Sequence, residues 1–147
     1  MTAGVTPVRL ARRADWPEQL AAYIEERRHV PFTWGVNDCA TFAAGALARI
    51  AVAGTALGGL LPAPWHDEAT AADALRQLGG MRGGCRAVLG APVLGPRAAL
   101  VGRGAVVCVR LPQATLGVAA GNGRWCAPGA DGLVWRPMSE VRRAWEA

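Results

Sequence analysis

The chain contains no lysine, and all 16 of its basic residues are arginine. Alanine and glycine are abundant, which together with the missing lysine is typical of a high-GC coding bias rather than of selection for a partner. The formal net charge of +5 therefore carries little functional information. The arginines also form no dense run and are not interleaved with aromatic residues, so the sequence argues against nucleic-acid binding.

Long apolar runs are also absent. The longest one, residues 50–61, contains three glycines and is too short to span a bilayer. The amino terminus lacks the basic start, apolar run and small-residue cleavage site of a signal peptide. We therefore expect a soluble protein that is made in the cytoplasm and does not insert into membranes.

Metal-binding and redox motifs are missing as well. The four cysteines, at positions 39, 85, 108 and 126, form no CxxC motif and no Cys/His pair. We expect free thiols and no cofactor or metal; the alternative is a disulfide or a metal site assembled in space from residues distant in sequence. Histidine is equally scarce, with only His29 and His66 in the chain.

At 147 residues, the chain is long enough for one domain and too short for two. The first residues show no periodicity, so we expect a flexible arm over 1–14 and a single domain over 15–147. Asp15 and Glu18 have capping-box spacing and predict a helix that ends near Arg28. A second helix is expected to begin at Asp38 or Cys39 and to end before residue 54.

The second helix is expected to lie in the core and to bury Phe42, Leu47 and Ile50. Thr70 and Asp73 predict a short third helix that ends near residue 79. Residues 81–102 are rich in glycine and proline and are expected to be irregular, with one or two short strands.

Four strand-like runs follow, at 105–110, 115–120, 124–126 and 133–136, and turns are expected at Pro112, 121–123 and 128–129. Ser139 is expected to cap a terminal helix that carries Val141 and Trp145. Helices first and an antiparallel β-meander after them predict an α+β fold.

Residues 31–42, P-F-T-W-G-V-N-D-C-A-T-F, place Cys39 at the start of the second helix. A helix N-terminus favours the thiolate over the thiol, so a cysteine at this position can act as a nucleophile. Such a nucleophile needs an imidazole within hydrogen-bond reach and a third group that orients the imidazole. Neither histidine lies where that partner is expected in the sequence.

The sequence resembles the NlpC/P60 cell-wall peptidases, which have a papain-like fold, at two places, the second of which consists of two consecutive runs. Residues 34–39, W-G-V-N-D-C, resemble the segment that leads into the family's nucleophile helix. Residues 104–109 and 115–123 resemble its G-D-L-V-F-F strand and the following H-V-G-I-Y-I-G-N-G. The resemblance implies a papain-like fold with Cys39 at the nucleophile position. It also places Thr115 at the base histidine, Ala127 near the third polar residue and Ala105 at the aspartate of the G-D turn.

Thr115 cannot accept a proton from a thiol at neutral pH, and Ala127 cannot orient an imidazole. The resemblance therefore implies the fold without the activity. The sequence is more similar overall to short phage and prophage proteins with a W-G-x-x-D-C helix start, which are encoded among tail genes. That likeness implies a catalytically depleted NlpC/P60 domain in the virion tail, made in a bacterial host and bound to other tail-tip proteins.

Each candidate residue also has a structural interpretation. Cys39 is a buried small side chain in one interpretation and a reactive thiol in the other. Asp38 is an N-cap or a catalytic acid, and Trp34 with Gly35 forms a packed turn or lines a substrate groove. His29 satisfies the last carbonyls of the first helix. His66 is the candidate for a displaced base, because a loop can bring it near the thiol.

Three functions remain open on this basis. The first is a structural or assembly component of a phage tail tip, with docking surfaces around residues 9–13 and 135–145. The second is an active peptidoglycan endopeptidase or amidase, with Cys39 as nucleophile and His66 as base. The third is a small thiol enzyme or ligand-binding domain unrelated to tails. Core packing is the favoured role for Trp125, Trp135 and Trp145.

Overall fold

The computed structural model describes residues 10–52 and 63–146. Four helices form the first half of the described chain: α1 (Trp16–Arg27), α2 (Cys39–Ile50), α3 (Glu68–Gln77) and α4 (Gly80–Leu89). The strands are β1 (Val93–Leu94), β2 (Val106–Arg110), β3 (Ala114–Gly121), β4 (Arg124–Gly129), β5 (Gly132–Pro137) and β6 (Arg143–Trp145). Two 3-10 helices, η2 (Gly95–Leu100) and η3 (Met138–Glu140), complete the described elements. The predicted α+β class is confirmed.

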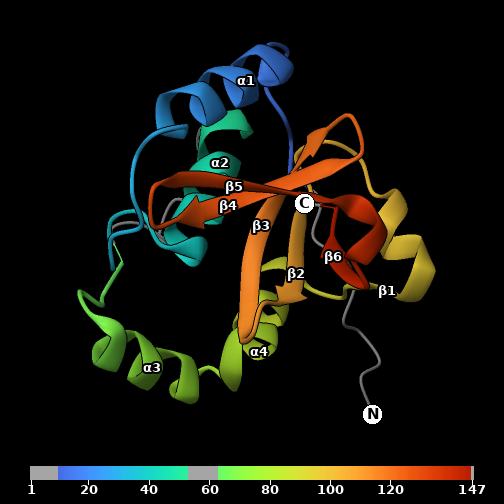
Figure 1. The fold of residues 1–147 in the computed structure, drawn as a ribbon. Helices are drawn as coiled ribbons and strands as arrows, with labels where there is room; N and C mark the ends of the chain where they lie inside the picture. Colours follow the sequence, from blue (N-terminus) through green and yellow to red (C-terminus); the bar gives the residue numbers. More distant parts are fainter. Residues whose placement is uncertain (1–9, 53–62, 147) are drawn as a thin grey trace.

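The six strands form one antiparallel sheet in the order β1-β6-β2-β3-β4-β5. The β2 to β5 portion is the expected meander. Helices α1, α2 and α4 supply residues to the core on one face of the sheet, and α3 packs on α4 at the margin of the molecule (Figure 1). The opposite face carries a second core cluster that includes Ala98 of η2 and Met138 of η3. In the described part of the chain, no helix has the length and apolar character needed to cross a bilayer.

Helix α2 lies at the centre of the first cluster, as predicted. Phe42, Leu47 and Ile50 are almost completely buried against sheet residues that include Val106 and Val118. Its N-terminus points toward the loop that connects α1 to α2. The fold therefore fixes Cys39 at the boundary between the core and the surface.

The predicted start of α1 at Asp15 is confirmed without its predicted side-chain cap, and the predicted start of α3 is shifted. Asp15 precedes α1, but its carboxylate accepts hydrogen bonds from Arg13 and Gln19 instead of capping the helix. Helix α3 begins at Glu68 with Asp67 as its N-cap, and Thr70 is the third helical residue rather than the cap. An N-cap carboxylate that is already bound by other side chains does not cap the helix, and capping-box spacing alone does not reveal this.

Residues 81–102 are not wholly irregular, because α4 occupies their first part. Met81, Cys85 and Val88 recur at helical spacing and pack on or within the main core cluster, and this burial offsets the low helix propensity of the glycines. Gly83 is needed for close packing, since a Cβ there would collide with the Leu78 carbonyl oxygen. The expected short strand is present as β1.

The predicted terminal helix is wrong. After η3, residues 143–145 form β6, which inserts between β1 and β2 and pairs Trp145 with Val106. The otherwise unpaired edge of β2 outweighs the helical capping signal at Ser139.

Pro128 and Gly129 lie inside β4 rather than in a turn, whereas the turn at 121–123 is confirmed, with a positive φ at Asn122.

Residues 11–13 of the expected flexible arm run along the end of α2. Arg13 N–H donates to the Ile50 carbonyl, and Val52 N–H donates to the Ala11 carbonyl. The Arg12 guanidinium stacks on Trp16, 4.4 Å from the ring centroid. Residues 1–9 of the expected arm lie outside the described residues.

Candidate functional site

The loop that leads into α2 is held by a buried asparagine. Asn37 is completely buried, and its side-chain amide donates to the carbonyls of Val30 and Pro31, both at 3.2 Å. Its side-chain oxygen accepts from Arg27 at 3.2 Å. Asn37 therefore fixes the loop between α1 and α2 and sets the position from which α2 begins.

Asp38 is the centre of a hydrogen-bond network at the start of α2. One carboxylate oxygen accepts from the Thr41 backbone N–H at 2.8 Å, and Asp38 N–H donates to the Thr41 hydroxyl at 2.8 Å, which completes a capping box. The other oxygen accepts from Gly35 N–H at 2.8 Å and from the Trp65 indole at 2.6 Å. Since Asp38 is only 2% exposed and both oxygens are engaged, its geometry is that of a structural cap.

The Trp65 contact joins two segments that are far apart in sequence. Gly35 adopts a positive φ of 77°, and a Cβ there would collide with the Trp65 carbonyl oxygen. The turn at 33–37 and the segment before α3 are thus packed backbone to backbone. This contact carries His66 toward the start of α2.

The Cys39 thiol is half-buried beside the central strand β3. Burial raises the pKa of the Cys39 thiol to about 11, and the nearby Asp38 and Cys108 act in the same direction. Backbone N–H groups of Leu116 and Ala40 oppose the shift without reversing it. The expectation that the helix N-terminus favours the thiolate is therefore wrong for this cysteine, which is a neutral thiol at pH 7.

Thr115, at the position expected to match the base histidine of the NlpC/P60 peptidases, lies on the sheet face opposite the one on which α2 packs. Side chains alternate along β3, and Leu116 and Val118 belong to the cluster on which α2 packs. Thr115 pairs with Val109, which packs against the opposite cluster. Its hydroxyl donates to the Gln113 carbonyl at 3.1 Å. Alternation thus directs the Thr115 side chain away from Cys39.

Ala105 and Ala127 belong to that opposite cluster as well, and both are buried. Ala105, Thr115 and Ala127, the positions expected to match the aspartate, base and orienting residue of the NlpC/P60 peptidases, are thus not gathered around the Cys39 thiol. Trp125 and Trp145 are buried in the core, as favoured, and Trp135 is half-buried with Arg124 stacked 4.6 Å from its ring centroid.

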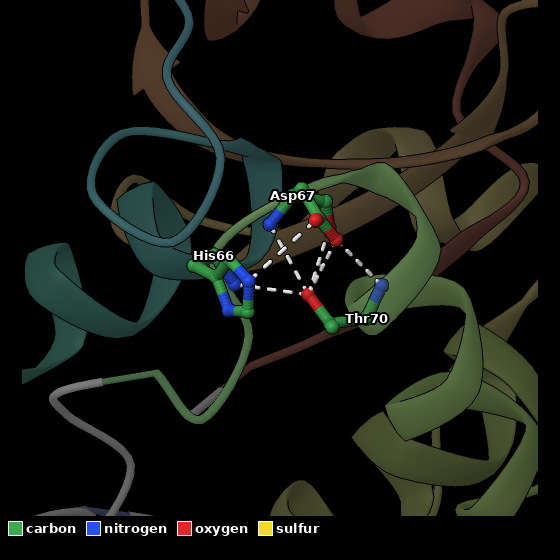
Figure 2. A network of polar contacts seen from close by, with 3 residues as sticks. All are labelled: His66, Asp67 and Thr70. Carbon is green, nitrogen blue, oxygen red and sulfur yellow. Dashed lines mark hydrogen bonds and ion pairs between the residues drawn. The ribbon is translucent and has the colours of Figure 1, made fainter.

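The His66 side chain is 78% exposed and faces Asp67, with 3.5 Å between Nε2 and the carboxylate oxygen. Figure 2 shows this imidazole beside the second capping box of the chain, in which Asp67 accepts from Thr70 N–H at 2.8 Å. The Thr70 hydroxyl also accepts from the backbone N–H groups of His66 and Asp67, at 3.1 Å each. His29 is exposed just beyond the end of α1.

Among the described residues, no three His, Cys, Asp or Glu side chains are arranged to hold a metal ion. Sequence reasoning overlooked Asn37 and Trp65, which hold the site together. The sequence did contain a signal for the capping box at Asp67, because Asp67 and Thr70 have the same D-x-x-T spacing as Asp38 and Thr41. No sequence signal links Trp65 to Asp38.

The family model described as "Domain of unknown function (DUF6950)" matches residues 11–147, and the chain belongs to this family. No curated protein matches the chain. No solved structure matches it either.

Proposed function

We propose that this member of the DUF6950 family is a structural or assembly component of a phage-like tail tip, in which a degenerate cysteine-peptidase-like domain of the NlpC/P60 type serves as a docking module. One observation carries the proposal. Cys39 stands at the start of the central helix and beside the central strand, but its thiol is neutral and has no hydrogen bond to a histidine in the described part of the chain. Thiol catalysis needs a thiolate or a base that generates one.

The turn ahead of Cys39 is the proposed docking surface for another tail-tip protein. Val36 is 68% exposed and Trp34 is 37% exposed, and Trp34 packs edge-on against Phe32 with 4.8 Å between ring centroids. Aromatic residues are enriched at the centres of protein interfaces. In a related peptidase, the same turn would line the substrate groove, so loss of catalysis would leave it free for binding.

The experiment is co-production of the chain with the products of the genes that neighbour its own gene, followed by purification of any tail-like particles. We expect the chain in the particles, and we expect the double variant Trp34→Ser/Val36→Ser to be depleted from them. Val134→Ser, which changes an exposed valine on β5, is the matched control and should be incorporated normally. A wild-type chain that never co-purifies with tail proteins would refute the assignment.

A second candidate is an active peptidoglycan hydrolase with Cys39 as nucleophile and His66 as base. It is favoured by one observation, the packing of the Trp65 segment against the start of α2. We expect no cleavage of peptidoglycan or of its stem peptides. Cleavage that is lost in both Cys39→Ala and His66→Ala would establish this candidate instead.

A further inference from the structure

The described residues line an apolar cavity of about 290 Å³, partly open to solvent, between α2, α3 and α4. Leu47, Leu75, Leu78 and Val88 form much of its wall, and Trp65 closes one side. Trp65, which lines the cavity, also packs against Gly35 in the turn at 33–37, so the cavity adjoins the proposed docking surface. Cys39 does not line the cavity.

The few polar groups in the cavity wall are already engaged. The Trp65 indole N–H donates to Asp38, and the Thr41 hydroxyl bonds within the capping box. The Cys85 thiol stays neutral because burial raises its pKa to about 12. The part of any ligand that enters this cavity must therefore be apolar, since it would find no free hydrogen-bond partner.

Three arginines from three different elements lie around Cys108, whose neighbours Val106 and Leu116 line the cavity. Side-chain alternation puts Arg110 of β2 and Arg143 of β6 on the sheet face that carries Val106 of the cavity wall. Arg82 follows Met81, another wall residue, at the start of α4. All three guanidinium groups lie within electrostatic range of Cys108.

The guanidinium groups of these three arginines make no hydrogen bond or ion pair with another residue in the part of the chain that the structure describes. Two arginines elsewhere in the fold differ in this respect. Arg13 pairs with Asp15, and Arg49 pairs with Glu26. Three unpaired cations close together repel one another, and an anion placed between them would relieve that repulsion.

We propose that the cavity binds a medium-chain aliphatic carboxylate, with the chain between α2 and α4 and the carboxylate against Arg82, Arg110 and Arg143. The wall selects an apolar chain, and the arginines select a negative head group that guanidinium groups can bind through paired hydrogen bonds. An apolar cavity of about 150 Å³ holds benzene, so twice that volume suits a chain of about ten carbons.

The binding test uses decanoate at concentrations below micelle formation and follows Trp fluorescence and calorimetry, since Trp65 lies in the cavity wall. We expect saturable binding of one decanoate per chain. Decanol, which keeps the chain but lacks the charge, should bind at least tenfold more weakly, and decyltrimethylammonium should not bind. Equal affinity for decanoate and decanol would overturn the role of the arginines.

Two substitutions in α4 distinguish binding in the cavity from binding on the protein surface. Gly84 lines the cavity, and a Cβ there makes only ordinary contact with Leu78, so Gly84→Leu should fill the space without unfolding α4. We expect it to weaken decanoate binding at least tenfold, whereas the control Ala87→Leu, on the exposed side of α4, should bind normally. Normal binding by a folded Gly84→Leu protein would overturn the site.

The proposed binding of the carboxylate by arginines is tested with a triple variant that combines Arg82→Gln, Arg110→Gln and Arg143→Gln. Arg97→Gln in η2 is the control for lost charge. We expect at least a tenfold loss in the triple variant and none in the control. Vesicles with and without anionic lipid distinguish a free ligand from a membrane. Binding to anionic vesicles without binding of monomeric decanoate would show a surface for lipid head groups and would refute the proposed cavity ligand.

Discussion

The chain contains two capping boxes of the same D-x-x-T pattern, one at the start of α2 and one at the start of α3. In both, the threonine N–H donates to the aspartate at 2.8 Å. Asp38 is 2% exposed and its second oxygen holds Gly35 and Trp65, whereas the Asp67 side chain is 53% exposed and its second oxygen faces solvent-exposed His66.

The comparison separates what a local motif does from what its surroundings add. Both boxes satisfy the orphan N–H groups of a helix start, which is a local function. Only the first box also joins the start of α2 to the distant Trp65 segment. We therefore expect equivalent substitutions at the two boxes to differ in effect, and the following predictions test that difference.

The largest loss of stability is expected from a substitution at the fourth residue after the N-cap aspartate. Phe42 and Ala71 occupy this same position, and their N–H groups close the first helical bond to Asp38 and Asp67. Phe42→Ala gives α2 the residue that α3 has at this position. It should lower the free energy of unfolding by about 3–5 kcal/mol, because Phe42 is fully buried. Urea denaturation measures this loss, and a change near zero would mean that α2 is peripheral.

Asp38→Ala should have the next largest effect, about 2–4 kcal/mol, because it removes the cap and leaves the Gly35 and Trp65 N–H groups without an acceptor. The measurement is again urea denaturation. Asp38→Asn is the matched control, since it keeps one acceptor oxygen and the same shape, and it should lose less stability. Equal losses in both variants would mean that the charge, rather than the hydrogen bonds, stabilises the site.

Trp65→Phe removes the indole donor but keeps an aromatic ring. We expect a loss of about 1–2 kcal/mol, since one charge-assisted hydrogen bond disappears. A double-mutant cycle with Asp38→Ala should show a coupling of about 1 kcal/mol. Additive effects would show that the two side chains do not act together.

Asp67→Ala should lower the melting temperature less than half as much as Asp38→Ala. Hydrogen bonds from Thr70 hold the pKa of Asp67 below its usual value. The stabilisation from Asp67 is therefore present above the ordinary aspartate pKa and is lost as the pH falls through the lowered folded-state value. Thermal melts from pH 7 to pH 2 should show the difference between Asp67→Ala and wild type disappearing at the acidic end.

The smallest effect is expected from His66→Ala on the reactivity of Cys39. Burial raises the pKa of the Cys39 thiol to about 11, so its alkylation by iodoacetamide should keep accelerating up to that pH. The folded protein disfavours the thiolate, so this thiol's contribution to stability is lost as the pH rises toward 11. Mass spectrometry of the Cys39 peptide should give the same pH profile in both proteins. A profile that shifts in His66→Ala would indicate a thiol and imidazole pair.

The sequence predicted well those elements whose stability is local. The α2 start at Asp38 and the hairpin turn at 121–123 depend on residues within a few positions of one another, and both are confirmed. It predicted poorly the elements that depend on distant partners. Helix α4 needs the core against which Cys85 and Leu89 pack, and β6 needs the open edge of β2.

The same distinction holds for the candidate site. The sequence by itself determined that Cys39 follows an N-cap at the start of an apolar helix, because capping involves groups only three residues apart. Only the tertiary structure decided that Trp65 reaches Asp38 and that Thr115 points away from the thiol. It also decided that burial outweighs the helix N-terminus at Cys39. These outcomes depend on which surfaces exclude water and which face of a strand meets a helix, and both are set by packing between residues remote in the chain.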